Sequence, residues 1–162
     1  MGDTVDKIMQ QWRHERPELD LAPMAVTARL TRLAALLERG VDDTLAAQGL
    51  ASWEFEVLAS LRRNGSPFVL SVGRLQSTMM ISSGTMTHRL DRLEKRRLVA
   101  RAKDLNDRRG IQVALTPDGR TLIDQVIEAR LARERDLLTP LENDHQTQLV
   151  SCAGNSPAKS GE

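Results

Sequence analysis

The chain has 162 residues, with 23 lysines and arginines against 22 aspartates and glutamates. The resulting net charge of +1 does not by itself indicate a polyanionic partner. Aromatic residues are scarce, and this composition favours a helical core of aliphatic side chains. No apolar run approaches the roughly 20 residues of a membrane span, the N-terminal stretch lacks the apolar segment of a signal peptide, and the single Cys152 allows no disulfide within the chain. We therefore expect a cytoplasmic protein with no membrane partner.

Catalytic and metal-binding patterns are missing from the sequence. The three histidines, at positions 14, 88 and 145, are scattered and lack the paired spacing of zinc ligands. The chain has no glycine-rich phosphate-binding motif, no nucleophile elbow and no HExxH motif. The sequence thus gives no support for an enzyme, and we expect no metal and no cofactor.

The first segment, residues 1–23, is polar and is predicted to be a short helix followed by an extended arm. It contains Trp12, and a large apolar ring in a charged segment indicates a docking surface on a neighbouring helix or subunit. Apolar residues then recur every three or four positions over residues 24–48, which predicts a long amphipathic helix ended by Gly49. Those apolar residues are Val26, Leu30, Leu33, Leu37, Val41 and Leu45.

The next helix is predicted over residues 53–63, with Ser52 as its cap and Asn64-Gly65 as its end. Its inward positions are Phe55, Leu58 and Leu61. Glu56 lies among these apolar positions, so we expect it to be buried enough to need a partner.

Two helices joined by a short turn follow. Ser71 can cap a helix over residues 72–78, and residues 79–81 form a tight connection to a second helix that Ser82 or Ser83 can cap. Two such helices, the second polar on its outer face, are typical of a helix-turn-helix.

The second helix has two different faces. Its apolar residues Met86, Leu90 and Leu93 recur at helical spacing and are predicted to pack on the domain. The opposite face is expected to present the hydrogen-bond donors of Thr85, His88, Arg89 and Arg92.

Residues 98–103 and 111–115 have the branched, roughly alternating character of two short strands. The loop between them, DLNDRRG, supplies turn residues and places Arg108 and Arg109 at or near its tip. A basic hairpin beside a polar-faced helix can hold a DNA duplex at two places, the helix in the major groove and the arginines at phosphates or in the minor groove.

Charge is concentrated in this part of the chain. Residues 83–110 contain nine basic and four acidic side chains, and the remainder of the chain is net acidic. Such segregation is typical of a surface that binds a polyanion. The cluster Lys95, Arg96 and Arg97 alone is equally consistent with a solvated helix face.

The C-terminal part begins with Thr116-Pro117, a strong helix-start signal for a helix that runs to about residue 138. Thr139-Pro140 repeats the signal and predicts a final short helix, while residues from Ala153 have the composition of a disordered tail. Long apolar stripes at both ends of a small core predict a homodimer in which the first and last helices of two subunits interlock.

These elements predict a mainly α (α+β) fold, a winged helix-turn-helix with N- and C-terminal dimerisation helices. The predicted parts are an arm and dimerisation helix (1–48), the DNA-binding domain (49–116), the C-terminal dimerisation helices (117–152) and the tail (153–162).

The segment ISSGTMTHRLDRLEKRRLVARAKDLNDRRGIQVALTPDGRTLID resembles the DNA-binding lobe of MarR-family transcriptional regulators. DxxDRR at Asp104 to Arg109, followed by LTPDGR, is the most specific part, and the resemblance extends over about residues 8–150. It implies a dimeric winged helix-turn-helix repressor that a small molecule releases from its palindromic operator.

A narrower resemblance lies in QWRHERPELD and WEFEVLASLRR, which look like the subgroup of urate-responsive regulators and the trans-aconitate methyltransferase regulator. In that subgroup a Trp, an acidic residue and two Arg form an anion pocket between the dimer helices and the DNA lobe. The matching positions are Trp12, Glu56, Arg89 and Arg101. The subgroup has Asp where this chain has Glu56, whose additional methylene shifts the carboxylate.

The ligand residues suggest a physical mechanism. Glu56 would balance one or both arginines in the ligand-free state, and a carboxylate or urate-like anion could replace it through bidentate contact with guanidinium. Recruiting Arg89 would tilt or tie up the recognition helix. The alternative is that Arg101 and Glu56 form a structural ion pair while Arg89 contacts phosphate.

The expected DNA-binding residues are Ser82, Ser83, Thr85, Thr87, His88, Arg89, Arg92, Arg108 and Arg109. Two further alternatives remain at this point. The basic face could bind an acidic protein partner, or the protein could bind double-stranded DNA without responding to any ligand.

Overall fold

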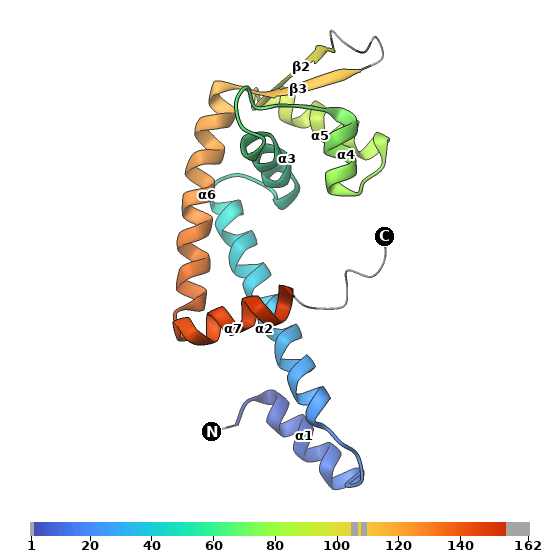
Figure 1. The fold of residues 1–162 in the computed structure, drawn as a ribbon, viewed down its shortest axis with the longest axis vertical. Helices are drawn as coiled ribbons and strands as arrows, with labels where there is room; N and C mark the ends of the chain where they lie inside the picture. The colour runs from blue at the N-terminus through green and yellow to red at the C-terminus, as the bar shows by residue number, and fades with distance from the viewer. Residues whose placement is uncertain (1, 105–106, 108–109, 155–162) are drawn as a thin grey trace. The chain divides into compact units, whose positions relative to one another are not determined.

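The structure is a computed structural model that describes residues 2–104, 107 and 110–154 (Figure 1). Its elements, in chain order, are α1 (Thr4–Glu15), α2 (Ala22–Ala47), α3 (Ser52–Arg63), β1 (Val69–Ser71), α4 (Val72–Met79), α5 (Ser83–Lys95), β2 (Val99–Lys103), β3 (Ile111–Leu115), α6 (Pro117–Leu138) and α7 (Asn143–Gly154). The chain divides into two compact units, Met1–Val41 and Asp42–Glu162. No helix in the described ranges is both long and apolar enough to cross a membrane.

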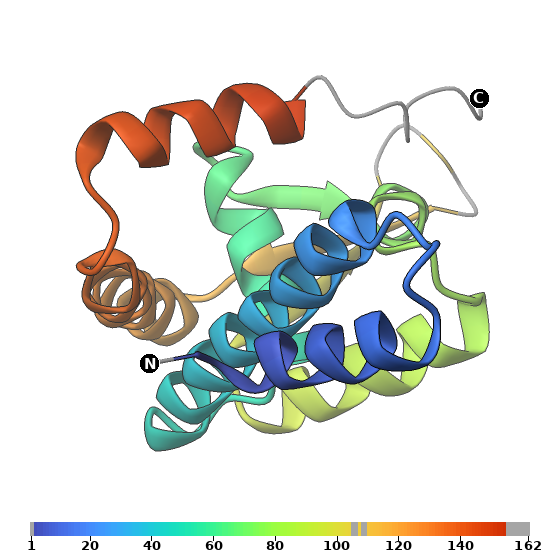
Figure 2. The ribbon, with the colours of Figure 1, turned by 90° about the horizontal axis from the view of Figure 1, so that it is seen from below.

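The first unit is a helix pair in which α1 lies along the first part of α2 (Figure 2). The predicted N-terminal helix is therefore confirmed. Val5, Met9 and Leu21 form its small core, and Ala25 and Ala28 of α2 pack against them. Alanines at this contact let the two helices approach closely.

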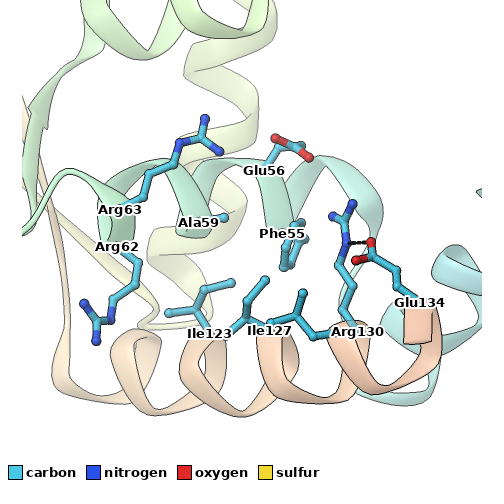
Figure 3. A pocket seen from close by; sticks show the side chains of 10 residues that line it. Phe55, Glu56, Ala59, Arg62, Arg63, Ile123, Ile127, Arg130 and Glu134 are labelled. Carbon is cyan, nitrogen blue, oxygen red and sulfur yellow. Dashed lines mark hydrogen bonds and ion pairs between the residues drawn. The ribbon is translucent and has the colours of Figure 1, made fainter. Parts of the chain in front are cut away.

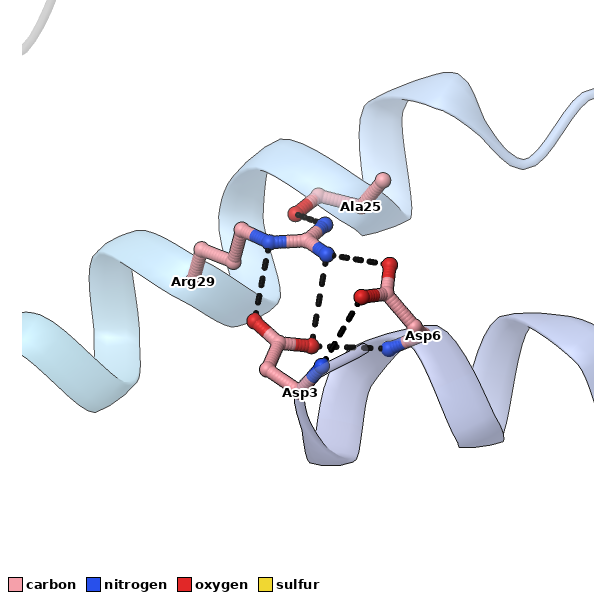
Figure 4. Close-up of polar contacts among 4 residues, drawn as sticks. All are labelled: Asp3, Asp6, Ala25 and Arg29. Atoms are coloured by element: carbon pink, nitrogen blue, oxygen red, sulfur yellow. Dashed lines mark hydrogen bonds and ion pairs between the residues drawn. The ribbon is translucent and has the colours of Figure 1, made fainter. Parts of the chain in front are cut away.

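An ion-pair network also joins α1 to α2 (Figure 4). Arg29 contacts Asp3 at 3.1 Å and Asp6 at 2.5 Å, and it donates a further hydrogen bond to the carbonyl of Ala25. Asp3 and Asp6 in addition cap the start of α1 reciprocally. The backbone N–H of Asp3 and the guanidinium of Arg29 lower the pKa of Asp6.

Much of the apolar stripe of α2 remains uncovered in the single chain. Val26 is 59% exposed, Leu30 50% and Leu36 55%. These side chains line a shallow groove together with Leu33. A stripe of this kind on a helix indicates a surface that is buried by another element or subunit.

The second unit contains a small antiparallel sheet of order β1-β3-β2. Leu70 of β1 faces Val113 of β3, and Arg101 of β2 faces the same Val113 from the other side. The predicted two-stranded wing is thus confirmed, but β1 was not predicted. Its three residues are too few to show the two-residue period by which a strand is recognised in a sequence.

The helices α3, α4 and α5 pack with this sheet around an aliphatic core. The predicted inward residues of α5 are fully buried, as are those of α3 apart from a small exposed fraction of Phe55. Figure 1 shows α6 running alongside α3, and Ile123 and Val126 of α6 are buried. The fold is the predicted winged helix-turn-helix with additional helices at both ends.

Several predicted helix ends are confirmed by their geometry. Gly49 follows α2 with φ +70°, a conformation that glycine adopts without strain. Ser71 and Thr116 accept hydrogen bonds from the first-turn amides of α4 and α6. Ser82, rather than Ser83, caps α5.

Two predicted helix starts are wrong. Ser52 does not cap α3, because its hydroxyl bonds Asp42 while the carboxylate of Glu54 accepts from the N–H of Ala51. Thr139 does not start the last helix, since its hydroxyl donates back to Arg135 at the end of α6. The final helix α7 begins at Asn143 and includes the first two residues of the predicted tail, whose other residues lie outside the described ranges.

The start of α6 lies directly against the start of the wing. The hydroxyl of Thr116 donates to the carbonyls of Arg97 and Leu98, and a Cβ on Gly119 would lie 2.0 Å from the carbonyl oxygen of Leu98. Only glycine permits this approach. The threonine and glycine of the LTPDGR motif therefore fix β2 to α6.

Candidate nucleic-acid interface

The helix α5 presents a polar face to solvent while its opposite face is fully buried. Met86, Leu90 and Leu93 are at most 1% exposed, so the helix is held firmly in the core. At its start the Ser82 hydroxyl accepts from the N–H of Thr85, and the two hydroxyls also bond each other at 2.9 Å.

The side chains predicted to contact DNA at the start of α5 are exposed. They are Ser82, Ser83, Thr85, Thr87 and His88. The hydroxyl of Thr87 donates to the carbonyl of Ser83 at 3.0 Å, which leaves its oxygen as an acceptor and its methyl group free. The start of a helix has unpaired backbone N–H groups and a positive dipole end, both of which favour a phosphate nearby.

One flank of α5 is held by Trp53, from the first turn of α3. The guanidinium carbon of Arg92 lies 5.0 Å from the centre of the indole ring, and that of Arg89 lies 5.5 Å from it. Arg89 is half-buried, so it lies beside the exposed face rather than at its centre. Sequence reasoning missed Trp53, because no local pattern connects it to residues more than 30 positions away.

The next residue of α3 extends the same contact along α5. Glu54 is 3% exposed, and its carboxylate accepts from Arg96 at 2.8 Å. Arg96 also donates to the carbonyl of Gly49. The buried carboxylate of this helix is thus Glu54, whereas Glu56, for which burial was expected, is exposed.

Arg101 of β2 holds the other flank of α5. Its guanidinium contacts Glu94 at 2.5 Å and Asp91 at 2.7 Å, and its backbone N–H also donates to Glu94. The hydrogen bond with Glu94 raises the pKa of Arg101, and the same bond lowers the pKa of Glu94. The helix α5 is therefore tied to α3 on one side and to the wing on the other.

The predicted ligand residues are not brought together by direct contacts. Arg89 faces Trp53, whereas Arg101 faces Asp91 and Glu94 on the other flank. No hydrogen bond or ion pair joins Glu56 to either arginine in the described part of the chain. The alternative in which Arg101 pairs with Glu56 is therefore wrong, because the acidic residues of α5 take that place.

The fourth predicted ligand residue, Trp12, belongs to the first unit. It lies on α1, and 40% of its surface is exposed. Arg108 and Arg109, which the sequence predicts at or near the wing tip, lie outside the described residues, so their predicted DNA contacts remain predictions.

Glu56 instead lines a hollow of about 430 Å³ between α3 and α6 (Figure 3). Phe55, Ile123, Ile127 and Leu131 form its apolar wall. Its charged lining is Glu56, Arg62, Arg63, Arg130 and Glu134.

The charges of this hollow are not all balanced. Arg130 is paired with Glu134 at 2.8 Å, and Arg62 with Asp124 at 2.6 Å. Among the described residues Arg63 bonds only the hydroxyl of Ser60, and Glu56 has no partner. An apolar wall with a few charged groups at its rim is typical of a small-molecule site.

Metal binding has no candidate here. Within residues 2–104, 107 and 110–154, no three His, Cys, Asp or Glu side chains are arranged to hold a metal ion.

Comparison with known proteins decides the family. A sequence profile of the MarR family matches residues 50–111. The HTH-type transcriptional regulator PecS of Dickeya dadantii is 39% identical over 150 residues, which cover 93% of this chain and 90% of that protein. The chain belongs to the MarR family.

Other MarR-family proteins are similar over much of the chain. The HTH-type transcriptional repressor MdtR of Bacillus subtilis is 33% identical over 123 residues, covering 72% of this chain and 77% of that protein. Bordetella bronchiseptica BpsR, a protein whose DNA binding is regulated by 6-hydroxynicotinic acid, is similar in structure with a TM-score of 0.65 and 26% identity. The match covers 79% of this chain and 95% of that one. The protein is therefore a DNA-binding transcriptional regulator of the MarR family and not an enzyme.

Proposed function

We propose that this MarR-family protein is a homodimeric repressor that a small anionic or aromatic molecule releases from a palindromic operator. The observation that carries the DNA-binding part is the geometry of α5. Its polar face is exposed from Ser82 to His88, and its other face is fully buried. A helix held in this way enters the major groove as a rigid reader.

We assign the contacts by the chemistry of each side chain. Thr85, Thr87 and His88 approach base edges, and Ser82 and Ser83 lie at the helix start where a phosphate is favoured. Arg89 and Arg92 lie beside them and support phosphate contacts, while Arg108 and Arg109 reach the minor groove or its phosphates.

The dimer is supported by the uncovered stripe of α2. Val26, Leu30 and Leu36 are each at least half exposed, and a second copy of the chain would bury them. A two-fold dimer presents two copies of α5 to half-sites about one helical turn, roughly 10 base pairs, apart. The relative MdtR is named a transcriptional repressor, which supports repression of transcription for this protein too. We place such a regulator in the cytoplasm.

The effector part rests on Glu56 and the hollow between α3 and α6. The carboxylate of an aromatic acid suits Arg63, whose guanidinium has no acidic partner among the described residues, and its ring suits the wall of Phe55 and Ile127. The regulation of BpsR by 6-hydroxynicotinic acid supports this chemical class. The resemblance to the urate and trans-aconitate subgroup offers a second position for the anion, at Arg89 or Arg101 beside α5.

The two arginines also suggest how a ligand acts on DNA binding. Arg89 and Arg101 hold opposite flanks of α5 through Trp53 and through the two acidic residues of the helix. An anion that draws either guanidinium away from its partner changes how the helix is held. Such a ligand binds the DNA-incompetent state more tightly, which is what release requires.

The test is binding of the purified protein to DNA from its own promoter region, with and without urate, trans-aconitate, citrate and 6-hydroxynicotinic acid. We expect one of these anions to weaken specific binding at least tenfold. Arg63→Ala should abolish that effect if the anion occupies the hollow, whereas Arg101→Ala should abolish it if the anion binds at the flank of α5.

The remaining results separate the alternatives. Tight specific binding that no anion weakens supports a ligand-independent DNA-binding protein. Binding without sequence preference supports an architectural role, and the absence of duplex binding supports a protein-interaction module.

A further inference from the structure

The arginines around α5 fall into two groups according to what holds them. Arg96 and Arg101 are paired with carboxylates, of Glu54 in the first case and of Asp91 and Glu94 in the second. Arg89 and Arg92 have no acidic partner among the described residues, and both lie against the ring of Trp53.

The two kinds of partner have different effects on DNA binding. A carboxylate cancels the charge of the guanidinium and occupies its N–H donors. An aromatic ring attracts the cation through its π-face, carries no charge, and leaves the in-plane N–H donors available for another acceptor. Arg89 and Arg92 therefore keep both their charge and their donors while their positions are restricted.

The location of these two arginines explains how restricting their positions can favour DNA binding. On a helix of 3.6 residues per turn, Arg92 and Glu94 point about 200° apart, so the ring-held and carboxylate-held flanks are on opposite sides of α5. Arg92 is exposed and lies one turn after His88, at the edge of the face assigned to DNA. A phosphate beside that face is within its reach.

We propose that Trp53 is a positioning residue for DNA binding, whose ring holds the guanidinium groups of Arg89 and Arg92 beside the recognition helix as uncompensated cations for the phosphate backbone. This inference rests on the DNA-binding function proposed above. An arginine that is already ordered loses less side-chain entropy when it meets a phosphate. Trp53 thus acts on affinity without touching DNA.

The test compares wild-type protein with Trp53→Leu and Trp53→Phe by fluorescence anisotropy on an operator duplex and on an unrelated duplex, at several salt concentrations. Trp53→Leu should weaken binding about three- to tenfold on both duplexes, since phosphate contacts carry no sequence information. The slope of log K against log salt should become shallower by about 1 for each phosphate that an arginine no longer neutralises. Trp53→Phe should recover part of both effects, because it keeps a smaller ring.

Two controls separate positioning from general destabilisation. Phe68 lies under Arg62 and Arg120 at 5.0 and 4.9 Å, so Phe68→Leu removes a similar ring that holds neither Arg89 nor Arg92 and should change affinity less than twofold. In an Arg89→Ala/Arg92→Ala background, Trp53→Leu should have no further effect.

Three results would overturn the inference. If Trp53→Leu changes neither the affinity nor the salt slope, the inference is contradicted while the DNA-binding function stands. The same holds if Trp53→Leu causes an equal loss of affinity in the double-alanine background. Wild-type protein that binds neither duplex contradicts the inference together with the DNA-binding function.

Discussion

Replacing Arg96 by alanine tests how firmly the first turn of α3 is attached to α5. The substitution removes the bond of 2.8 Å to Glu54 and leaves that carboxylate, 3% exposed, with the N–H of Ala51 as its one remaining partner among the described residues. The other carboxylate oxygen, Oε1, already lacks a hydrogen bond within the described structure. An unpaired buried charge is therefore the main consequence of the change.

The expected loss of stability depends on how deeply the side chains of Glu54 and Arg96 are buried. A hydrogen bond to a charged group contributes about 1.5–3 kcal/mol, and breaking a fully buried ion pair costs about 3–5 kcal/mol. The side chain of Arg96 is 38% exposed, which places this pair below the fully buried case. We expect Arg96→Ala to lower the free energy of unfolding by about 2–3 kcal/mol, and Glu54→Gln, which keeps the shape but removes the charge, by only about 1 kcal/mol.

Urea unfolding followed by circular dichroism measures both variants, at one protein concentration because a dimer unfolds in a concentration-dependent way. The decisive quantity is the difference between the two variants. A decrease under about 1 kcal/mol for Arg96→Ala, or a larger decrease for Glu54→Gln than for Arg96→Ala, would show that the Glu54 carboxylate does not depend on Arg96 in the folded protein.

Three further predictions concern stability. Gly119→Ala should lower the free energy of unfolding by about 2–3 kcal/mol, because the added Cβ overlaps a backbone carbonyl. Gly73→Ala is the control, since nothing lies within 4 Å of its added Cβ, and it should leave the free energy of unfolding unchanged or slightly higher. Equal effects of the two substitutions in urea unfolding would contradict the close approach at Gly119. The lowered pKa of Glu94 means that its bond to Arg101 stabilises the fold fully above the ordinary glutamate pKa of about 4.3 and is lost as pH falls through the lower folded value. Glu94→Gln should accordingly flatten the loss of stability that wild-type protein shows below about pH 4, and an unchanged pH profile would argue against it. Ser82→Ala should lower the unfolding free energy by about 1 kcal/mol through loss of the α5 cap, and a change near zero in thermal unfolding would argue against that cap.

Local chemistry made most of the secondary structure predictable. Gly49, Ser71 and Thr116 mark helix ends through interactions within a few residues, so their roles follow from the sequence alone. The buried face of α5 was predictable for the same reason, because helical periodicity fixes which side chains share a face.

Tertiary contacts explain what was missed. Glu54 and Glu56 lie two positions apart in one helix, and the apolar pattern does not say which of them is buried. Arg96, 42 positions further along, decides that it is Glu54. The contact between Trp53 and Arg92 is equally remote in sequence.

The candidate site also has one part that was predictable from the sequence and one part that was not. The exposed start of α5 was predictable because an amphipathic helix must show its polar face. The partners of Arg101 were not, since Asp91 and Glu94 become its neighbours only when the wing folds back on the helix.

The proposal that α5 reads the operator is tested most directly by comparing the affinity of the purified protein for duplexes from its own promoter region with its affinity for a scrambled duplex of equal length, at physiological salt. We expect at least a thousandfold preference for a site with two half-sites about 10 base pairs apart, and loss of that preference in a variant with Thr85 and His88 both replaced by alanine. Equal affinity for the promoter and scrambled duplexes, or a preference that the double replacement leaves intact, would contradict the claim that α5 reads the operator.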